Sequence, residues 1–280
     1  MIPAPAGPPG DILRIWRRRR HLSQLDLALE AEISQRHLSC LESGRARPSR
    51  AMLLRLAERL GIPLRERNAL LVAAGYAPVF AARSLDDPAL APARRAVARI
   101  LDGHAPYPAL AVDRHWTLIA ANAAVAPLLD GVDPALLAGP VNVLRLSLHP
   151  GGLAPRILNL REWRAHLLDR LRQQVAASGD PVLARLADEL AAYPAPPDVP
   201  SHAASCDGGG VAVPLVLAVP AGRLSLLSTT TVFGTPVDIT LAELALEAFF
   251  PADPETAALL HRLAPPHGPA RTAPSTETDL

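Results

Sequence analysis

Residues 22–44 carry apolar and polar positions with the period of two short helices joined by a turn. Ser23 followed by Asp26 is a capping pattern, because the serine hydroxyl satisfies backbone donors that the first turn of a helix leaves unpaired. We therefore expect a helix from Gln24. Its apolar face consists of Leu27, Ala28 and Ala31.

A second helix is expected after Ser34, which would cap it, and Gly44 would end it. Leu38 and Leu41 recur at helical spacing and should point inward. The side chains expected to face solvent are Gln35, Arg36, His37 and Ser39. Two such helices share too small an apolar seam to be stable alone.

The flanking segments supply further helices that would complete a core. A preceding helix carries Leu13 and Trp16, and a fifth helix is expected over 62–75. Between them, a helix capped by Ser49 presents Leu53, Leu54, Leu56, Ala57 and Leu60. The pattern predicts an all-α domain of five helices over residues 10–75.

This domain resembles the helix-turn-helix domain of the Cro and phage-repressor type, also called the xenobiotic-response-element family. The matching pieces are LSQ, Ala28, ISQRHLSCLESG and Pro48-Ser49, in register without a gap. The resemblance implies that Gln24 binds backbone phosphate. It also implies that the residues reaching base edges are Gln35, Arg36 and His37, with Ser39 one turn further along.

The resemblance implies, in addition, an ion pair between Arg17 and Glu42. The sequence departs from the family at Glu32, because the turn there normally carries glycine. A non-glycine residue in a left-handed conformation costs roughly 1 kcal/mol, so we expect a slightly different turn. On an isolated helix a Gln, an Arg and a His would simply be solvated, but within five helices they indicate DNA binding, since Gln can pair with adenine and Arg with guanine.

Charge is distributed unevenly along the chain. All 28 basic residues are Arg, and the net charge is +1. Residues 1–80 hold 13 Arg against 7 acidic residues, a balance of +6, whereas the remaining 200 residues hold 15 against 20, a balance of −5. The positive charge therefore coincides with the predicted DNA-binding domain, as phosphate attraction requires.

Four consecutive arginines, Arg17 to Arg20, would point around the whole circumference of the first helix and need separate interpretations. Arg17 is assigned to the pair with Glu42. The other three are expected either to approach phosphate or to stay solvated.

Beyond residue 75 the pattern changes. We expect a linker over 76–106 with a short helix from Pro92 to Gly103, followed by a hairpin formed by ALAVD and WTLIAA. Asn122 is expected to cap a helix through Leu129. Further helices are expected within 142–192, and two strands over Val211–Val219 and Arg223–Val232.

Residues 107–263 resemble the ligand-binding domain of MmyB-like transcription regulators, an α+β, PAS-like fold around an apolar pocket. The matching pieces are AVDRHWTLIAANAA, NVLRLSLHPGGLAPRILNLREWRAHLLDRL, STTTVFGTPVDITLAELALEAFFPAD and PETAALLHRL. The resemblance implies a bacterial, ligand-responsive regulator, with a fatty-acid-like molecule as the ligand class. On the same ground we assign Thr240–Phe250 to a strand, against its helical propensity.

The candidate pocket residues place polar groups beside apolar ones, as small-molecule sites require; they are Asn159, Trp163, His166 and Arg170. We expect no catalytic residue, metal site or cofactor, because no His or Cys shows paired ligand spacing and no nucleophile elbow occurs. A haem site would need a lone axial His such as His149 or His166. Such a residue is more often structural.

The expected partners are operator DNA, a small apolar ligand and a second copy of the chain, with no membrane. Cys40 and Cys206 show no paired spacing, which fits a reduced cytoplasm. Prolines mark tails over 1–9 and 264–280 that we expect to be disordered. The alternatives are an enzyme acting on a lipid-like substrate in the C-terminal domain, and a DNA-bound protein-interaction module without a ligand.

Overall fold

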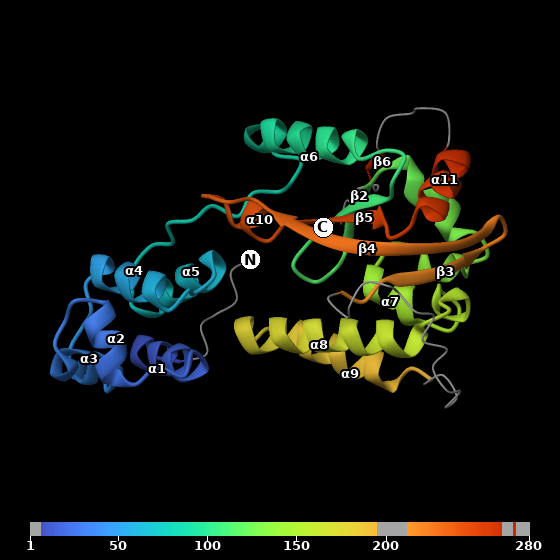
Figure 1. Ribbon diagram of the computed structural model, residues 1–280. Coiled ribbons are helices and arrows are strands. Elements are labelled where there is room, and N and C mark those ends of the chain that lie inside the picture. Colours follow the sequence, from blue (N-terminus) through green and yellow to red (C-terminus); the bar gives the residue numbers. More distant parts are fainter. Residues whose placement is uncertain (1–6, 195–211, 265–270, 273–280) are drawn as a thin grey trace. The chain divides into compact units, whose positions relative to one another are not determined.

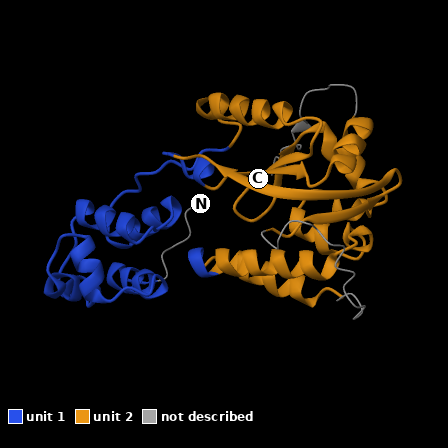
Figure 2. Cartoon of the chain, viewed as in Figure 1, with its two compact units in different colours: residues 1–84, 176–178, 235–242 blue, residues 85–175, 179–234, 243–280 orange. Residues whose placement is uncertain are grey.

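The computed structural model describes residues 7–194, 212–264 and 271–272. The chain forms two compact units (Figure 2). The first comprises residues 1–84 together with 176–178 and 235–242, and the second comprises 85–175, 179–234 and 243–280. Most of both predicted tails, and Cys206, lie outside the described residues.

The first unit contains the five predicted helices, α1 (Pro9–Arg19), α2 (Gln24–Glu30), α3 (Gln35–Glu42), α4 (Arg50–Arg59) and α5 (Leu64–Ala73). The capping predictions are confirmed, since the hydroxyls of Ser23, Ser34 and Ser49 each accept a hydrogen bond from the backbone N–H three residues on. Asp26 completes the capping box of α2.

The core of the first unit consists of the predicted apolar faces. Its fully buried side chains include Leu13, Leu27, Leu38, Leu41, Leu53, Leu56 and Leu60. The N-terminus of α1 lies directly against the end of α3. A Cβ at Gly10 would lie only 2.5 Å from the Leu41 carbonyl oxygen and 2.7 Å from that of Glu42, so glycine permits this contact.

The residues that follow α5 in the sequence are hydrogen-bonded to the first unit. The buried Asn68 side chain accepts hydrogen bonds from the backbone N–H groups of residues 79 and 80 and donates one to the Phe80 carbonyl. Residues 235–242 join this region, because buried Asp238 accepts a 2.9 Å bond from Arg83 and the Ile239 N–H donates to the Ala81 carbonyl. This segment contains α10 (Ile239–Ala242).

An antiparallel sheet forms the centre of the second unit (Figure 1). Its strand order is β3-β4-β5-β1-β2-β6. The strands are β1 (Ala109–Val112), β2 (Leu118–Ala121), β3 (Leu215–Val219), β4 (Gly222–Val232), β5 (Ala245–Pro251) and β6 (Arg271–Thr272). Strands β4 and β5 pair along seven residues each, from Leu226 opposite Pro251 to Val232 opposite Ala245.

Helices cover both faces of this sheet (Figure 1). Leu110 and Val112 of β1 belong to a large core shared with α7, α8 and α9. Ala109 and Ala111 face the opposite side of the sheet and pack against α6. The helices are η1 (Pro88–Leu90), α6 (Ala91–Gly103), η2 (Ala123–Leu129), η3 (Pro134–Leu136), α7 (Val143–Leu148), η4 (Ala154–Arg156), α8 (Leu160–Ser178), α9 (Pro181–Ala192) and α11 (Pro254–Leu263), those labelled η being 3₁₀ helices.

The α+β prediction and the hairpin of β1 and β2 are confirmed, but two local predictions are wrong. The expected strand over Thr240–Phe250 begins as α10, because the Asp238 side chain caps that turn at the Thr240 N–H, and β5 starts only at Ala245. Asn122 does not cap the following helix; it binds Ala109, Leu101 and Tyr107 backbone groups. Residues 271–272 pair with β2 inside the tail predicted to be disordered.

Candidate functional sites

In the turn between α2 and α3, Glu32 occupies the position where the family normally has glycine. Glu32 has a φ of +54°, so a non-glycine residue does occupy the left-handed position. The Ile33 N–H donates to the Ala28 carbonyl at 2.9 Å and closes the turn. A helix-turn-helix geometry is therefore kept without the usual glycine.

The first turn of α3 presents its polar side chains to solvent. Gln35, Arg36 and His37 are exposed, and Ser39 is half-buried. Leu38 and Leu41 of the same helix are buried in the core. The four α3 residues that the sequence predicted for DNA contact are therefore all at least partly accessible to solvent.

Arg17 and Glu42 form the predicted pair. The Arg17 guanidinium donates to both carboxylate oxygens of Glu42, at 2.6 and 2.9 Å, and the side chains are only 10% and 2% exposed. Burial acts to raise the pKa of the Glu42 carboxyl, but hydrogen bonds from Arg17 and Gln24 hold that pKa below its ordinary value. The pair fixes α1 to the end of α3.

Gln24, the predicted phosphate ligand, is half-buried at the start of α2. Its amide nitrogen donates to Glu42 Oε2 at 2.9 Å. The side chain therefore belongs to the same network as Arg17, and its contact with phosphate stays a prediction.

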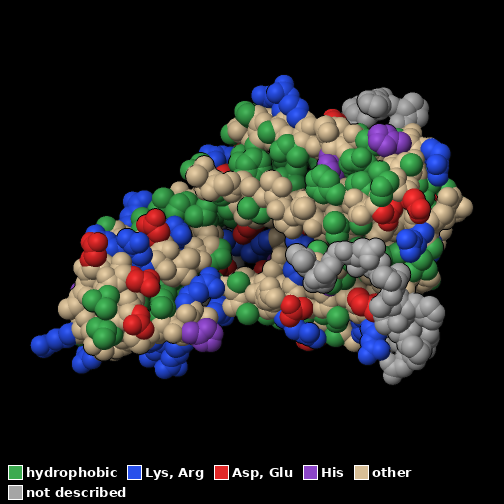
Figure 3. Space-filling model, viewed as in Figure 1, with side chains coloured by type: hydrophobic (Ala, Val, Ile, Leu, Met, Phe, Trp, Pro, Cys, Tyr) green, Lys and Arg blue, Asp and Glu red, His purple; other side chains and the backbone are tan. Residues whose placement is uncertain are grey.

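The run of arginines on α1 serves several purposes. Arg18 is exposed, as expected of a solvated or phosphate-binding side chain. Arg20 donates to the carbonyl oxygens of Leu60 and Gly61 at the end of α4, at 2.9 and 3.1 Å, which is a structural role that the sequence did not suggest. In Figure 3, blue arginine side chains project from the part of the first unit that carries α2 and α3.

The second unit contains an apolar cavity of about 320 Å³ between the sheet and helices α7 and α8. Most of its walls are aliphatic. The lining residues from the strands include Leu110, Leu118, Leu215, Leu217, Leu226 and Phe249, and those from the helices include Leu144, Leu146, Trp163 and Leu167. Such a wall excludes water and suits an apolar molecule.

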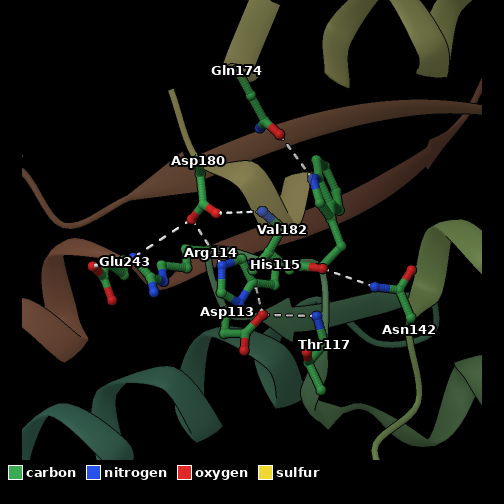
Figure 4. A network of polar contacts seen from close by, with 10 residues as sticks. Asp113, Arg114, His115, Thr117, Asn142, Gln174, Asp180, Val182 and Glu243 are labelled. Atoms are coloured by element: carbon green, nitrogen blue, oxygen red, sulfur yellow. Dashed lines mark hydrogen bonds and ion pairs between the residues drawn. The ribbon is translucent and has the colours of Figure 1, made fainter. Parts of the chain in front are cut away.

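One wall of the cavity is the indole of Trp116, which lies in the turn between β1 and β2. Its φ is +67°, a left-handed value that is strained for a bulky residue. Asp113 stabilises the turn by accepting hydrogen bonds from the backbone N–H groups of His115 and Thr117, both at 2.8 Å. The indole N–H donates to Gln174 Oε1 at 2.8 Å (Figure 4).

A polar network holds this turn from outside the cavity (Figure 4). His115 Nε2 lies 2.9 Å from Asp180 Oδ2, and Arg114 lies 3.6 Å from both Asp180 and Glu243. Burial acts to raise the pKa of Asp180, but hydrogen bonds from His115 and the Val182 N–H, with the Arg114 charge, keep that pKa below its ordinary value. The network fixes Trp116 against the end of α8.

The polar end of the cavity is an ion pair. Arg170 of α8 donates to both carboxylate oxygens of Glu247 of β5, at 2.6 and 3.1 Å. The Thr230 hydroxyl donates to the same carboxylate at 2.7 Å, and the guanidinium lies 4.5 Å from the centroid of the Trp116 ring. Arg170 and Glu247 both line the cavity.

The four residues predicted for this pocket divide into two groups. Trp163 and Arg170 line the cavity. Asn159 instead ties the start of α8 to β3, through bonds to the Pro214 carbonyl and the Val216 N–H, and the ring of His166 lies against Trp163 outside the lining. Sequence reasoning missed Glu247, although a single charge within the apolar run LALEAFF was a usable signal.

The part of the chain that the structure describes contains no cluster of His, Cys, Asp or Glu side chains arranged for a metal. Nor does any described helix have the length and apolar character needed to cross a bilayer.

Two family models match the chain, and together they cover both candidate sites. Residues 93–263, more than half of the chain, match the MmyB-like transcription regulator ligand binding domain. Residues 13–67 match the helix-turn-helix family. No curated protein matches the chain.

Proposed function

The chain belongs to the family of MmyB-like transcription regulators, and from that premise we propose that α3 reads operator DNA while the cavity of the second unit binds a small, largely apolar ligand. The observation that carries this proposal is the apolar cavity inside the matched ligand-binding domain. On this proposal the chain acts as a ligand-responsive regulator rather than as an enzyme.

The proposed DNA contact rests on the exposed first turn of α3. In a helix-turn-helix the N-terminal residues of the second helix contact base edges in the major groove. Gln35 and Arg36 have the chemistry for bidentate pairing with adenine and guanine, and both are exposed. His37 and Ser39 lie within the same two turns, and Gln24 is proposed to contact phosphate at the start of α2.

The proposed ligand is a fatty-acid-like molecule with an aliphatic chain. Aliphatic and aromatic side chains make up nearly all of the cavity lining, and the volume of about 320 Å³ is typical of the lower range of small-molecule sites. A saturated chain would be buried among leucines, with a polar end group beside Arg170 and Glu247.

A response to the ligand requires that it bind two states of the protein differently. Residues 235–242, which pack within the first unit beside Arg83, connect β4 to β5. Both strands contribute cavity residues, such as Leu226 and Glu247. If a ligand shifts β4 and β5, the movement can therefore be transmitted through residues 235–242 to the unit that carries α3.

Useful affinity for an operator requires two copies of the chain, because a single α3 reaches only a few base pairs. We place most of the dimer contact in the second unit, either in its ligand-binding part or in its helix α6, where Ile100 is 49% exposed. Sedimentation velocity of the full-length protein should show a dimer at micromolar concentration. A monomer at every concentration would remove this part of the proposal.

Solvent extraction of the purified protein, followed by mass spectrometry, tests the ligand directly. We expect an aliphatic molecule in stoichiometric amount, displaced when an excess of a competing chain is added. If a supplied lipid is instead converted to a product, the domain is an enzyme. If no aliphatic molecule is recovered and none can be bound, the domain is an interaction module.

A further inference from the structure

The charges at the cavity wall determine which end group a ligand can carry. Among the described lining residues, Arg170 and Glu247 are the only ionised ones, and they neutralise each other through two hydrogen bonds. The remaining polar lining groups include the hydroxyls of Ser147 and Ser228. The cavity is therefore electrically neutral, although it contains two charges.

A free carboxylate is poorly accommodated at this pair. It would have to lie beside the Glu247 carboxylate or take over the guanidinium of Arg170. The Glu247 side chain is 5% exposed, so losing its partner would leave a buried and uncompensated charge, which is strongly unfavourable. An ammonium group meets the corresponding problem at Arg170.

An uncharged end group avoids both costs. A hydroxyl both donates and accepts, so it can donate to a carboxylate oxygen of Glu247 and accept from Arg170 without separating them. A primary amide has the same pair of functions.

We propose that the cavity selects aliphatic molecules with an uncharged, hydrogen-bonding end group, such as a fatty alcohol or fatty amide, over the free carboxylate or amine of equal chain length. The inference rests on the proposed ligand-binding function, and it restricts the proposed fatty-acid-like ligands to those whose end group carries no charge.

Four probes with the same ten-carbon chain test the inference on the full-length protein at neutral pH. They are decan-1-ol, decanamide, decanoate and decylammonium, each kept below its aggregation concentration. Tryptophan fluorescence reports binding, because Trp116 and Trp163 both line the cavity. We expect the alcohol and the amide to bind at least tenfold more tightly than either ion.

Substitution of the pair should then change the order of preference. Glu247→Gln leaves the Arg170 charge in place and should make decanoate the tightest of the four probes, whereas Arg170→Gln should favour decylammonium. Glu189→Gln is the matched control, because it removes a carboxylate that accepts two hydrogen bonds from Arg145 and does not line the cavity. The control should keep the wild-type order.

The results that overturn the inference are distinct. Tightest binding of decanoate by the wild-type protein would contradict it, as would equal affinities for all four probes. If neither substituted protein folds, the wild-type order alone decides. If no probe binds at all, the proposed function of the cavity fails, and the inference fails with it.

Discussion

At the scale of single residues, Gly10 permits α1 to approach α3 more closely than any other residue type would. We expect Gly10→Ala to destabilise the first unit by about 1–3 kcal/mol, because the added methyl group meets backbone carbonyl oxygens that cannot rotate away. Hydrogen exchange at the amides of α3, measured by mass spectrometry on the full-length protein, would report the loss.

Gly103→Ala is the matched control for this substitution. Gly103 ends α6, and a Cβ there meets no atom within 4 Å. The control should leave exchange in α3 unchanged. Equal protection of α3 in the Gly10→Ala protein would show that the helix contact is looser than described.

The buried ion pair of Arg17 and Glu42 is the basis of a second prediction. Arg17→Ala should destabilise the first unit by about 3–5 kcal/mol, since it leaves a buried carboxylate without its partner. Thermal unfolding of the full-length protein, with the first unit followed by hydrogen exchange, measures this cost. A change below about 1 kcal/mol would mean that the pair behaves as a solvent-exposed one.

The pH dependence of this pair has a definite sign. Because the pKa of Glu42 is lower in the folded protein than its ordinary value of 4.5, its contribution to stability is complete above that value and is lost as the pH falls through the folded pKa. We expect Glu42→Gln to reduce stability at neutral pH and to flatten the decline below pH 4.5. A decline as steep as in the wild-type protein would assign the acid sensitivity to other carboxylates.

The role of a single side chain can be predicted from the sequence when its hydrogen-bond partners are close along the chain. The caps at Ser23 and Ser34 involve neighbouring backbone groups and were predictable. Asn122 and Asn159 resemble caps in sequence, but each binds backbone groups 13 or more residues away. The chain's own pattern contains no signal for such bonds.

At the scale of elements, α3 carries the prediction about recognition. We expect Gln35→Ala and Arg36→Ala to relax sequence preference, and Gln24→Ala to weaken binding to all sequences alike, because base contacts specify and phosphate contacts position. Competition between an operator and scrambled duplexes measures the difference. Gln24 also binds Glu42. The hydrogen-exchange protection of α3 in the Gln24→Ala protein must therefore first be compared with that of the wild-type protein. Equal losses on specific and scrambled DNA for all three proteins would contradict the assignment.

Elements with strong helical period were predicted well, and the ambiguous one was not. The segment from Thr240 to Phe250 contains enough apolar residues for either a helix or a strand. The structure divides it, with α10 hydrogen-bonded to the backbone of Ala81 and Arg83 and β5 within the sheet. Its first part is decided by contacts with a segment more than 150 residues earlier in the chain, which no local pattern encodes.

At the scale of the whole molecule, the two-part organisation was visible in the change of pattern after residue 75. The pattern did not reveal that residues 235–242, which lie within the predicted second domain, pack in the first unit. The cavity was expected only through the family resemblance. Its neutral polar end depends on Arg170 and Glu247 meeting across 77 positions of sequence.

The most direct test of the account is the affinity of the full-length protein for its operator with and without a ligand in the cavity. A duplex selected from a random pool by the protein itself would be titrated in the presence and absence of decan-1-ol. We predict that the alcohol changes the dissociation constant by about fivefold or more, and that it leaves binding to scrambled duplexes less affected. Superimposable titrations, under conditions where tryptophan fluorescence shows the cavity to be filled, would contradict a ligand-responsive regulator.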